Sequence, residues 1–172
     1  MTVYYCNSSS ISEEYSASEH IAGIIRSIKP EADAIAYIDC VYNSNEKIYG
    51  SHGNYVDKFL DGKSHSSLLL PLERSEIVKQ FKDGLIAYKE TPLGACTKVG
   101  PCKERAVRSF AACTNCDRSI IKISRLNKVI DRQVAFVEEL EAISPDSMAS
   151  RIESDELNIL RRYKCKVDNK GG

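Results

Sequence analysis

The sequence predicts a mainly α-helical fold, in which a small loop module with four cysteines leads into a long helix and a C-terminal helical hairpin. Three observations support this prediction. Apolar residues recur at helical spacing in several stretches, four of the seven cysteines fall within residues 96–116, and a short Ser-Pro step separates two long helical patterns near the C-terminus. The chain has 172 residues, 42% apolar and 28% charged, which suits a soluble protein of one domain, or of one domain with a small appendage.

The N-terminal region, residues 1–67, is predicted to be helical. A helix is expected from Ser12 to Ile28, because its isoleucines recur every three or four residues, and Pro30 is expected to end it. Residues 31–42 suit a buried helix better than a strand. Residues 43–62 are rich in Asn, Ser, Gly and Asp and are expected to be irregular.

The second region, residues 68–172, is predicted to hold the cysteine module and the hairpin. A helix is expected over residues 72–83, with Gly84 in the left-handed conformation just past its end. The cysteine segment shows little secondary-structure signal before Cys113. A long helix is then expected from Arg118 to Ile143.

The last helix is predicted to begin at Ser144-Pro145, with serine as the N-cap and proline in the first helical position. One apolar face is expected from Met148, Ile152, Ile159, Leu160 and Tyr163. The preceding long helix is basic in its first half and acidic at its end, an order that opposes the helix dipole. Tertiary packing or a partner is therefore expected to outweigh that unfavourable charge order.

The four clustered cysteines carry the most specific chemistry in the sequence. Cys96 and Cys102 flank a Gly-Pro turn, and Cys113 and Cys116 follow as a Cys-x2-Cys pair. Four thiolates that meet at one point predict a tetrahedral Zn²⁺ site, or as the alternative a [4Fe–4S] cluster. A set of small thiols buried in a core remains the plainer interpretation. A four-thiolate zinc site is closed to water, so its expected role is structural.

A local excess of positive charge coincides with the cysteines, although the whole chain has a net charge of zero. Residues 98–132 contain nine Lys/Arg and three Asp/Glu, a difference of six. These cations either keep the thiolates deprotonated or bind phosphate, and the sequence leaves both interpretations open. The candidate nucleic-acid-binding residues are Lys98, Lys103, Arg105, Arg108, Arg118, Lys122 and Arg125.

No catalytic centre is expected. The three histidines, His20, His52 and His65, stand apart from carboxylates and cysteines and are expected on the surface or in loops. Asp61-Gly-Lys-Ser64 lacks the first glycine and the strand context of a phosphate-binding loop. The N-terminus lacks the pattern of a secretory signal and no apolar run is long enough for a membrane span, so a reducing, cytoplasmic location is expected.

The segment Thr91-Pro-Leu-Gly94-Ala-Cys96, followed by Gly100-Pro-Cys102 and Cys113-x2-Cys116, resembles the cysteine-rich C-terminal segment of some tyrosine-recombinase-type integrases of bacterial mobile elements. The resemblance covers roughly residues 68–160. It implies a DNA-recombination setting. The family cleaves DNA with arginines, a His-x-x-Arg element and a tyrosine, and none of the three histidines here is followed three residues later by arginine. Strand cleavage by this chain is therefore not expected.

Three functional hypotheses follow. The first is a non-catalytic zinc-binding module that contacts DNA or a DNA-bound recombinase. The second is a protein-interaction adaptor, in which the helical hairpin binds a partner or a second copy and zinc only braces the fold. The third is an iron–sulfur redox or sensor protein.

Overall fold

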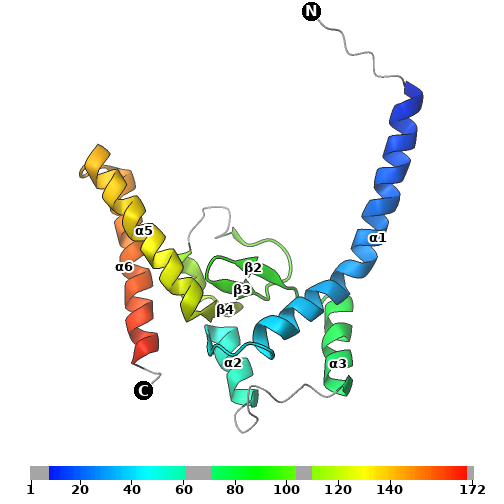
Figure 1. Ribbon diagram of the computed structural model, residues 1–172, viewed down its shortest axis with the longest axis horizontal. Coiled ribbons are helices and arrows are strands. Elements are labelled where there is room, and N and C mark those ends of the chain that lie inside the picture. Colours follow the sequence, from blue (N-terminus) through cyan, green and yellow to red (C-terminus); the bar gives the residue numbers. More distant parts are fainter. Residues whose placement is uncertain (1–7, 61–70, 104–109, 170–172) are drawn as a thin grey trace, which may run out of the picture.

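The computed structural model of the chain describes residues 8–60, 71–103 and 110–169 (Figure 1). Within these ranges the chain is mainly helical, as predicted. The α-helices are α1 (Ser8–Val41), α2 (Ser51–Leu60), α3 (Pro71–Lys82), α5 (Ile123–Ile143) and α6 (Met148–Asp168). The shorter elements are β1 (Ile48–Tyr49), β2 (Lys89–Thr91), β3 (Gly94–Cys96), the 3-10 helix η1 (Ala111–Asn115) and β4 (Ser119–Lys122).

A small antiparallel sheet forms the centre of the molecule, in the order β1-β4-β3-β2. β3 pairs with β4 so that Gly94 lies opposite Ile121 and Cys96 lies opposite Ser119. Gly94 has a φ of 150°, and a Cβ atom there would collide with the carbonyl oxygen of Ile120. Glycine at this position therefore allows the two central strands to approach each other closely.

The sheet joins two apolar clusters. The first contains Ala34 and Tyr37 of α1, Val56 of α2, Phe81 of α3 and Ile120 of β4. This cluster therefore draws side chains from both sides of the predicted boundary between residues 67 and 68.

The second cluster lies between the sheet and the C-terminal helices. Leu93, Ile121, Leu126 and Leu160 are essentially inaccessible to solvent there, and Phe110 and Cys113 pack against the same cluster. The cysteine segment and the hairpin thus share one core.

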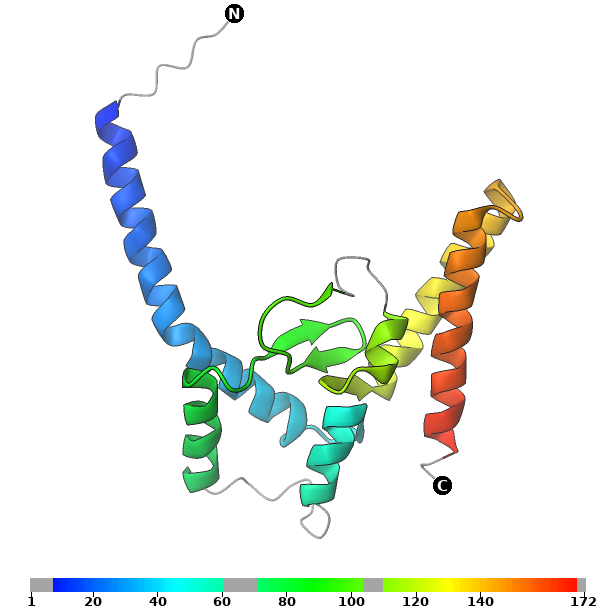
Figure 2. The same ribbon diagram turned by 180° about the vertical axis from the view of Figure 1, so that it is seen from behind.

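Two helical arms extend from this centre in different directions (Figures 1 and 2). One arm is the N-terminal half of α1, and the other is the antiparallel hairpin of α5 and α6. The described residues contain no helix with both the length and the apolar character needed to cross a membrane.

The prediction that Pro30 ends the first helix was wrong. α1 continues through Pro30 to Val41 and bends near its middle (Figure 2). Proline removes one backbone hydrogen bond and displaces the preceding turn, which bends a helix without ending it when packing holds the following segment. Ala34, Tyr37 and Val41 supply that packing, because all three are buried in the first cluster.

The predicted start of the last helix was also wrong. Ser144 caps the C-terminus of α5, and Ser147 is the N-cap of α6, where its hydroxyl accepts a hydrogen bond from the Ser150 backbone N–H at 3.1 Å. Asp146 adopts a φ of 63° between them. The turn therefore uses the left-handed conformation of an aspartate, and Pro145 lies in the connection.

The predicted hairpin is confirmed, but its buried face differs from the expected one. α6 buries Ser150, Leu157, Leu160 and Val167 against α5 and the centre. The expected face members Met148, Ile152 and Ile159 are exposed, as are Phe136 and Ile143 of α5. The hairpin therefore presents apolar side chains to solvent as well as to the core.

Two segments contain more regular structure than their sequence indicated. Residues 43–62, expected to be irregular, include β1 and α2. Residues 119–122, expected to open the long helix, form the central strand β4, and α5 begins at Ile123. β2 and β3 were not predicted, because strands of three residues are too short to show an alternating pattern. η1 was not predicted either, because a single turn of 3-10 helix is too short to show a helical pattern.

Candidate metal centre

The sheet and η1 place the four clustered cysteines. Cys96 ends β3, and Cys102 follows the Gly100-Pro101 turn that leaves this strand. Gly100 has a φ of 79°, which favours glycine over other residues. Lys89 of β2 holds the turn, since its ammonium group donates a hydrogen bond to the Gly100 carbonyl oxygen at 2.5 Å.

Cys113 and Cys116 lie at opposite ends of one tight turn. Cys113 belongs to η1, and Cys116 caps it by donating its backbone N–H to the Cys113 carbonyl oxygen at 3.3 Å. The chain then passes directly into β4, whose first residue, Ser119, lies opposite Cys96. Strand pairing therefore brings a Cys-x2-Cys turn next to the end of the strand that carries Cys96.

The electrostatics of Cys113 show that the four cysteines gather in one region. Burial raises the pKa of the Cys113 thiol most, and together with the charges of Cys116, Cys96 and Cys102 it brings the value to about 11. Cys113 thus lies close enough to all three other sulfurs to be influenced by them. Without a cation, these neighbouring charges disfavour the ionisation of Cys113.

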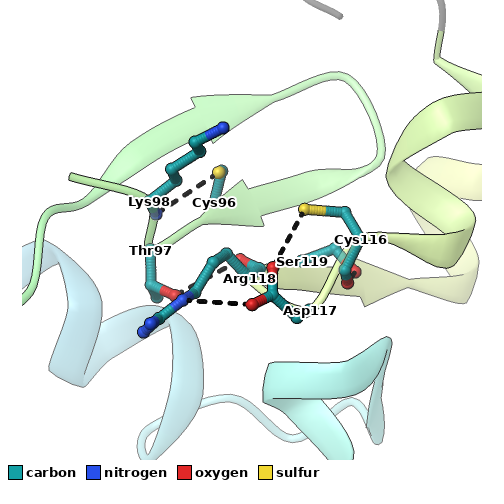
Figure 3. Close-up of polar contacts among 7 residues, drawn as sticks. All are labelled: Cys96, Thr97, Lys98, Cys116, Asp117, Arg118 and Ser119. Carbon is teal, nitrogen blue, oxygen red and sulfur yellow. Dashed lines mark hydrogen bonds and ion pairs between the residues drawn. The ribbon is translucent and has the colours of Figure 1, made fainter. Parts of the chain in front are cut away.

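The backbone next to Cys96 already donates to sulfur. The N–H of Lys98 lies 3.5 Å from the Cys96 Sγ (Figure 3). The Cys116 thiol lies 3.8 Å from a carboxylate oxygen of Asp117, and this contact is drawn in the same view. N–H donors beside a thiolate stabilise its negative charge, so Cys96 has one feature of a metal ligand.

The four sulfur atoms are not arranged closely enough to coordinate one metal ion. Among residues 8–60, 71–103 and 110–169, no group of three or more His, Cys, Asp or Glu side chains is arranged closely enough to hold a metal ion. The four thiols nevertheless have the chemistry of a closed zinc site, and the charges of the other three cysteines contribute, after burial, to the raised pKa of Cys113. The chemistry of this donor set, four soft thiolates, fits Zn²⁺.

The candidate phosphate-binding residues fall into two groups. Lys103 and Arg118 are exposed and Lys98 is partly exposed, all three next to a cysteine in the sequence or close to one. The Nε atom of Arg118 forms an exposed ion pair with Asp117 at 3.6 Å (Figure 3). Arg105 and Arg108 lie outside the described residues.

Lys122 and Arg125 are held by the protein itself. The ammonium group of Lys122 donates to the hydroxyl of Ser44 at 3.1 Å. The guanidinium of Arg125 donates to the carbonyl oxygens of Thr91 and Gly94 at 3.3 Å and 3.4 Å. These two cations therefore tie the start of α5 to the sheet and to the segment before β1.

One residue of the site was missed by the sequence analysis. Glu156 of α6 accepts hydrogen bonds at one carboxylate oxygen from the backbone N–H groups of Phe110 and Ala111, at 2.5 Å and 3.1 Å. These N–H groups stand at the start of η1, the helix that carries Cys113. Glu156 is 46 positions from Phe110 and 45 from Ala111, and no sequence pattern links residues so far apart. This contact could therefore be found only from the fold.

His52 is half-buried, whereas the sequence predicted a surface or loop position. Its Nε2 lies 2.9 Å from the hydroxyl of Tyr37, and the rings of Tyr37 and Tyr55 lie tilted against its own, with centroids 5.9 Å and 6.2 Å away. Burial lowers the pKa of His52, and the positive charge of Arg118 lowers it further. The histidine therefore joins α1 to α2 through Tyr37, a member of the first apolar cluster.

No protein-family model matches this chain, and no curated protein or solved structure matches it either.

Proposed function

We propose that the chain is a non-catalytic, zinc-braced module that contacts the phosphate backbone of DNA beside its cysteine loop. The observation that carries the proposal is that strand pairing puts Cys96 opposite Ser119, just after the turn of Cys113 and Cys116, with accessible cations close to these cysteines in the sequence. The resemblance to the cysteine-rich segment of integrases adds the setting, in which DNA or a DNA-bound recombinase is the partner.

Zinc would be held by the four thiolates and would close the loop between β3 and η1. Bound zinc would offset the burial and the neighbouring thiolate charges that raise the pKa of Cys113. The N–H group of Lys98 supports the thiolate of Cys96. Because all four ligands come from the protein, the expected contribution of the metal is stability.

DNA contact would use the cations that the fold leaves accessible. Lys98, Lys103 and Arg118 are accessible and lie within two residues of a cysteine in the sequence, whereas Lys122 and Arg125 are engaged within the protein. Phosphate contacts of this kind add affinity with little base specificity. Arg105 and Arg108 remain candidates from the sequence.

Fluorescence anisotropy with a labelled DNA duplex tests this part of the proposal. The triple variant Lys98→Ala/Lys103→Ala/Arg118→Ala is expected to weaken binding and to reduce the slope of log affinity against log salt by about 3, since each phosphate contact contributes about 0.9. The matched control removes three exposed cations from α6, Arg161→Ala/Arg162→Ala/Lys166→Ala. Equal losses in the two variants, or binding by the wild type that does not change with salt, would contradict contact at the cysteine loop.

A second candidate function is supported by the exposed apolar side chains of the hairpin. Phe136, Ile143, Met148, Ile152 and Ile159 are between 41% and 79% exposed. In this alternative the hairpin binds a protein partner or a second copy, and zinc braces the fold. Light scattering that shows a concentration-dependent dimer, together with no retention of DNA, would favour it over the first proposal.

A further inference from the structure

A carboxylate from the C-terminal hairpin holds the turn on which Cys113 stands. Glu156 lies in the middle of α6, and one of its oxygens receives the N–H groups of Phe110 and Ala111. The first N–H groups of a helix have no partner within the helix. Glu156 therefore supplies to η1 the acceptor that an N-cap side chain would usually supply, and Phe110, the N-cap of η1, forms no side-chain cap hydrogen bond.

The surroundings of this contact restrict how η1 can move. Phe110 and Cys113 pack against the second apolar cluster, which includes Leu157, the residue after Glu156, and Leu160. Thr114 is buried as well, and its hydroxyl donates to the Ala111 carbonyl oxygen at 2.7 Å. The orientation of the Cys-x2-Cys turn is therefore set on one side by α6.

The reach of Glu156 is the property that serves η1. One of its oxygens accepts both N–H groups, so the two hydrogen bonds need a side chain of this length with an acceptor oxygen at its end. A glutamine has the same length and an acceptor oxygen, so it would keep both bonds without the charge.

We infer that Glu156 is a positioning residue for the cysteine site, and that it couples metal binding to the placement of the C-terminal hairpin. This inference rests on the proposed zinc site. Partners that hold metal-binding residues in place commonly change metal affinity by about 10- to 100-fold when they are removed. By linkage, metal that fixes η1 also favours the docked position of α6.

Zinc affinity, measured by competition with a chelator of known affinity, tests the inference on the full chain. Glu156→Gln keeps the reach and an acceptor oxygen, so its zinc affinity is expected to remain close to that of the wild type. Glu156→Asp keeps the charge but withdraws the oxygens by one methylene, and Glu156→Ala removes them. Both are expected to bind zinc at least about 10-fold more weakly. Asp155→Ala, an exposed neighbour on α6, serves as the matched control and is expected to behave as the wild type.

A second measurement reports on the coupling itself. Zinc is expected to slow amide hydrogen exchange at Phe110, Ala111 and Leu157 in the wild type and in Glu156→Gln. In Glu156→Asp this effect on Leu157 is expected to be lost. Because the aspartate variant keeps the charge and a carboxylate on the helix, it remains informative if Glu156→Ala does not fold.

The results separate the inference from the proposed function. A wild-type protein that binds no zinc would overturn both. A wild type that binds zinc, with equal affinity in Glu156→Asp and Glu156→Ala, would overturn the inference alone. Weak zinc binding by Glu156→Gln would also contradict it, because charge would then matter more than reach.

Discussion

The carboxylate of Glu46 accepts two hydrogen bonds from Ser124, one from the backbone N–H at 2.6 Å and one from the hydroxyl at 2.8 Å. Ser124 is in the first turn of α5, and this turn contains no acidic residue of its own. Glu46 thus brings a negative charge to the positive end of a helix that begins with basic residues. This contact therefore offsets part of the unfavourable charge order of the long helix.

Replacement of Glu46 by alanine is expected to lower the free energy of unfolding by about 1–2 kcal/mol, because the N-terminus of α5 loses its acceptor. Urea denaturation followed by circular dichroism measures the change. Glu139→Ala, which removes an exposed acidic residue near the other end of α5, is the control and is expected to stay within about 0.5 kcal/mol of the wild type. Equal stability of Glu46→Ala and the wild type would show that the contact is unimportant.

The strand glycine Gly94 is expected to resist substitution. In Gly94→Ala the new Cβ would collide with the carbonyl oxygen of Ile120, so a loss of at least about 2 kcal/mol is expected. Gly23→Ala provides a contrast, since nothing lies within 4 Å of a Cβ at that helical position. This second variant is expected to stabilise the protein by up to about 1 kcal/mol, and thermal unfolding followed by circular dichroism measures both variants. A harmless Gly94→Ala would mean that β3 and β4 are not as close as described.

Acid is expected to destabilise the protein through His52. The pKa of His52 is lowered in the folded state by burial and by Arg118, so the unfolded chain takes up a proton first. The contribution of His52 to the stability is therefore complete above the ordinary histidine pKa of about 6.5. It decreases as the pH falls below that value, until the folded form is protonated as well. Urea titrations between pH 7.5 and 5, with chelator present, measure this decrease.

His52→Gln is the control for that titration, because glutamine does not ionise in this range. The variant is expected to show a smaller decrease in stability between pH 7 and 5 than the wild type, whatever its stability at pH 7.5. Identical pH dependence in the two proteins would assign the effect to other groups.

The thiol of Cys113 is expected to react slowly in metal-free, reduced protein. With its pKa raised to about 11, only about one molecule in a thousand carries the thiolate at pH 8. Cys165 is exposed on α6 and serves as the internal reference. Mass spectrometry after a short exposure to iodoacetamide is expected to find Cys165 modified well before Cys113. Equal rates of modification would contradict the burial of Cys113.

The sequence was sufficient to predict those parts of the fold that depend on local pattern. The apolar spacing in residues 123–143 and 148–168 identified the helical hairpin, and Gly84 takes the predicted left-handed conformation with a φ of 69°. The buried face of α6 could not be predicted in the same way. Its apolar residues surround much of the helix, and only the position of α5 and η1 decides that Leu157 is buried while Ile152 is exposed.

Contacts between distant segments explain the remaining differences. The sheet is built from strands of two to four residues that are stable only because β1 and β3 both pair with β4. Pro30 bends α1 without ending it because the residues that follow are buried. The four cysteines were recognised from their spacing, whereas Glu46 and Glu156 were not, since each caps a helix that lies far away in the sequence.

The metal content of freshly purified, reduced protein tests the proposed four-thiolate site most directly. Elemental analysis of the wild type is expected to find one zinc per chain, and Cys113→Ser is expected to lose the zinc together with much of its thermal stability. Cys165→Ser, which changes an exposed cysteine outside the cluster, is expected to keep both. A wild-type chain without zinc, or a Cys113→Ser variant that retains a full equivalent, would contradict the account.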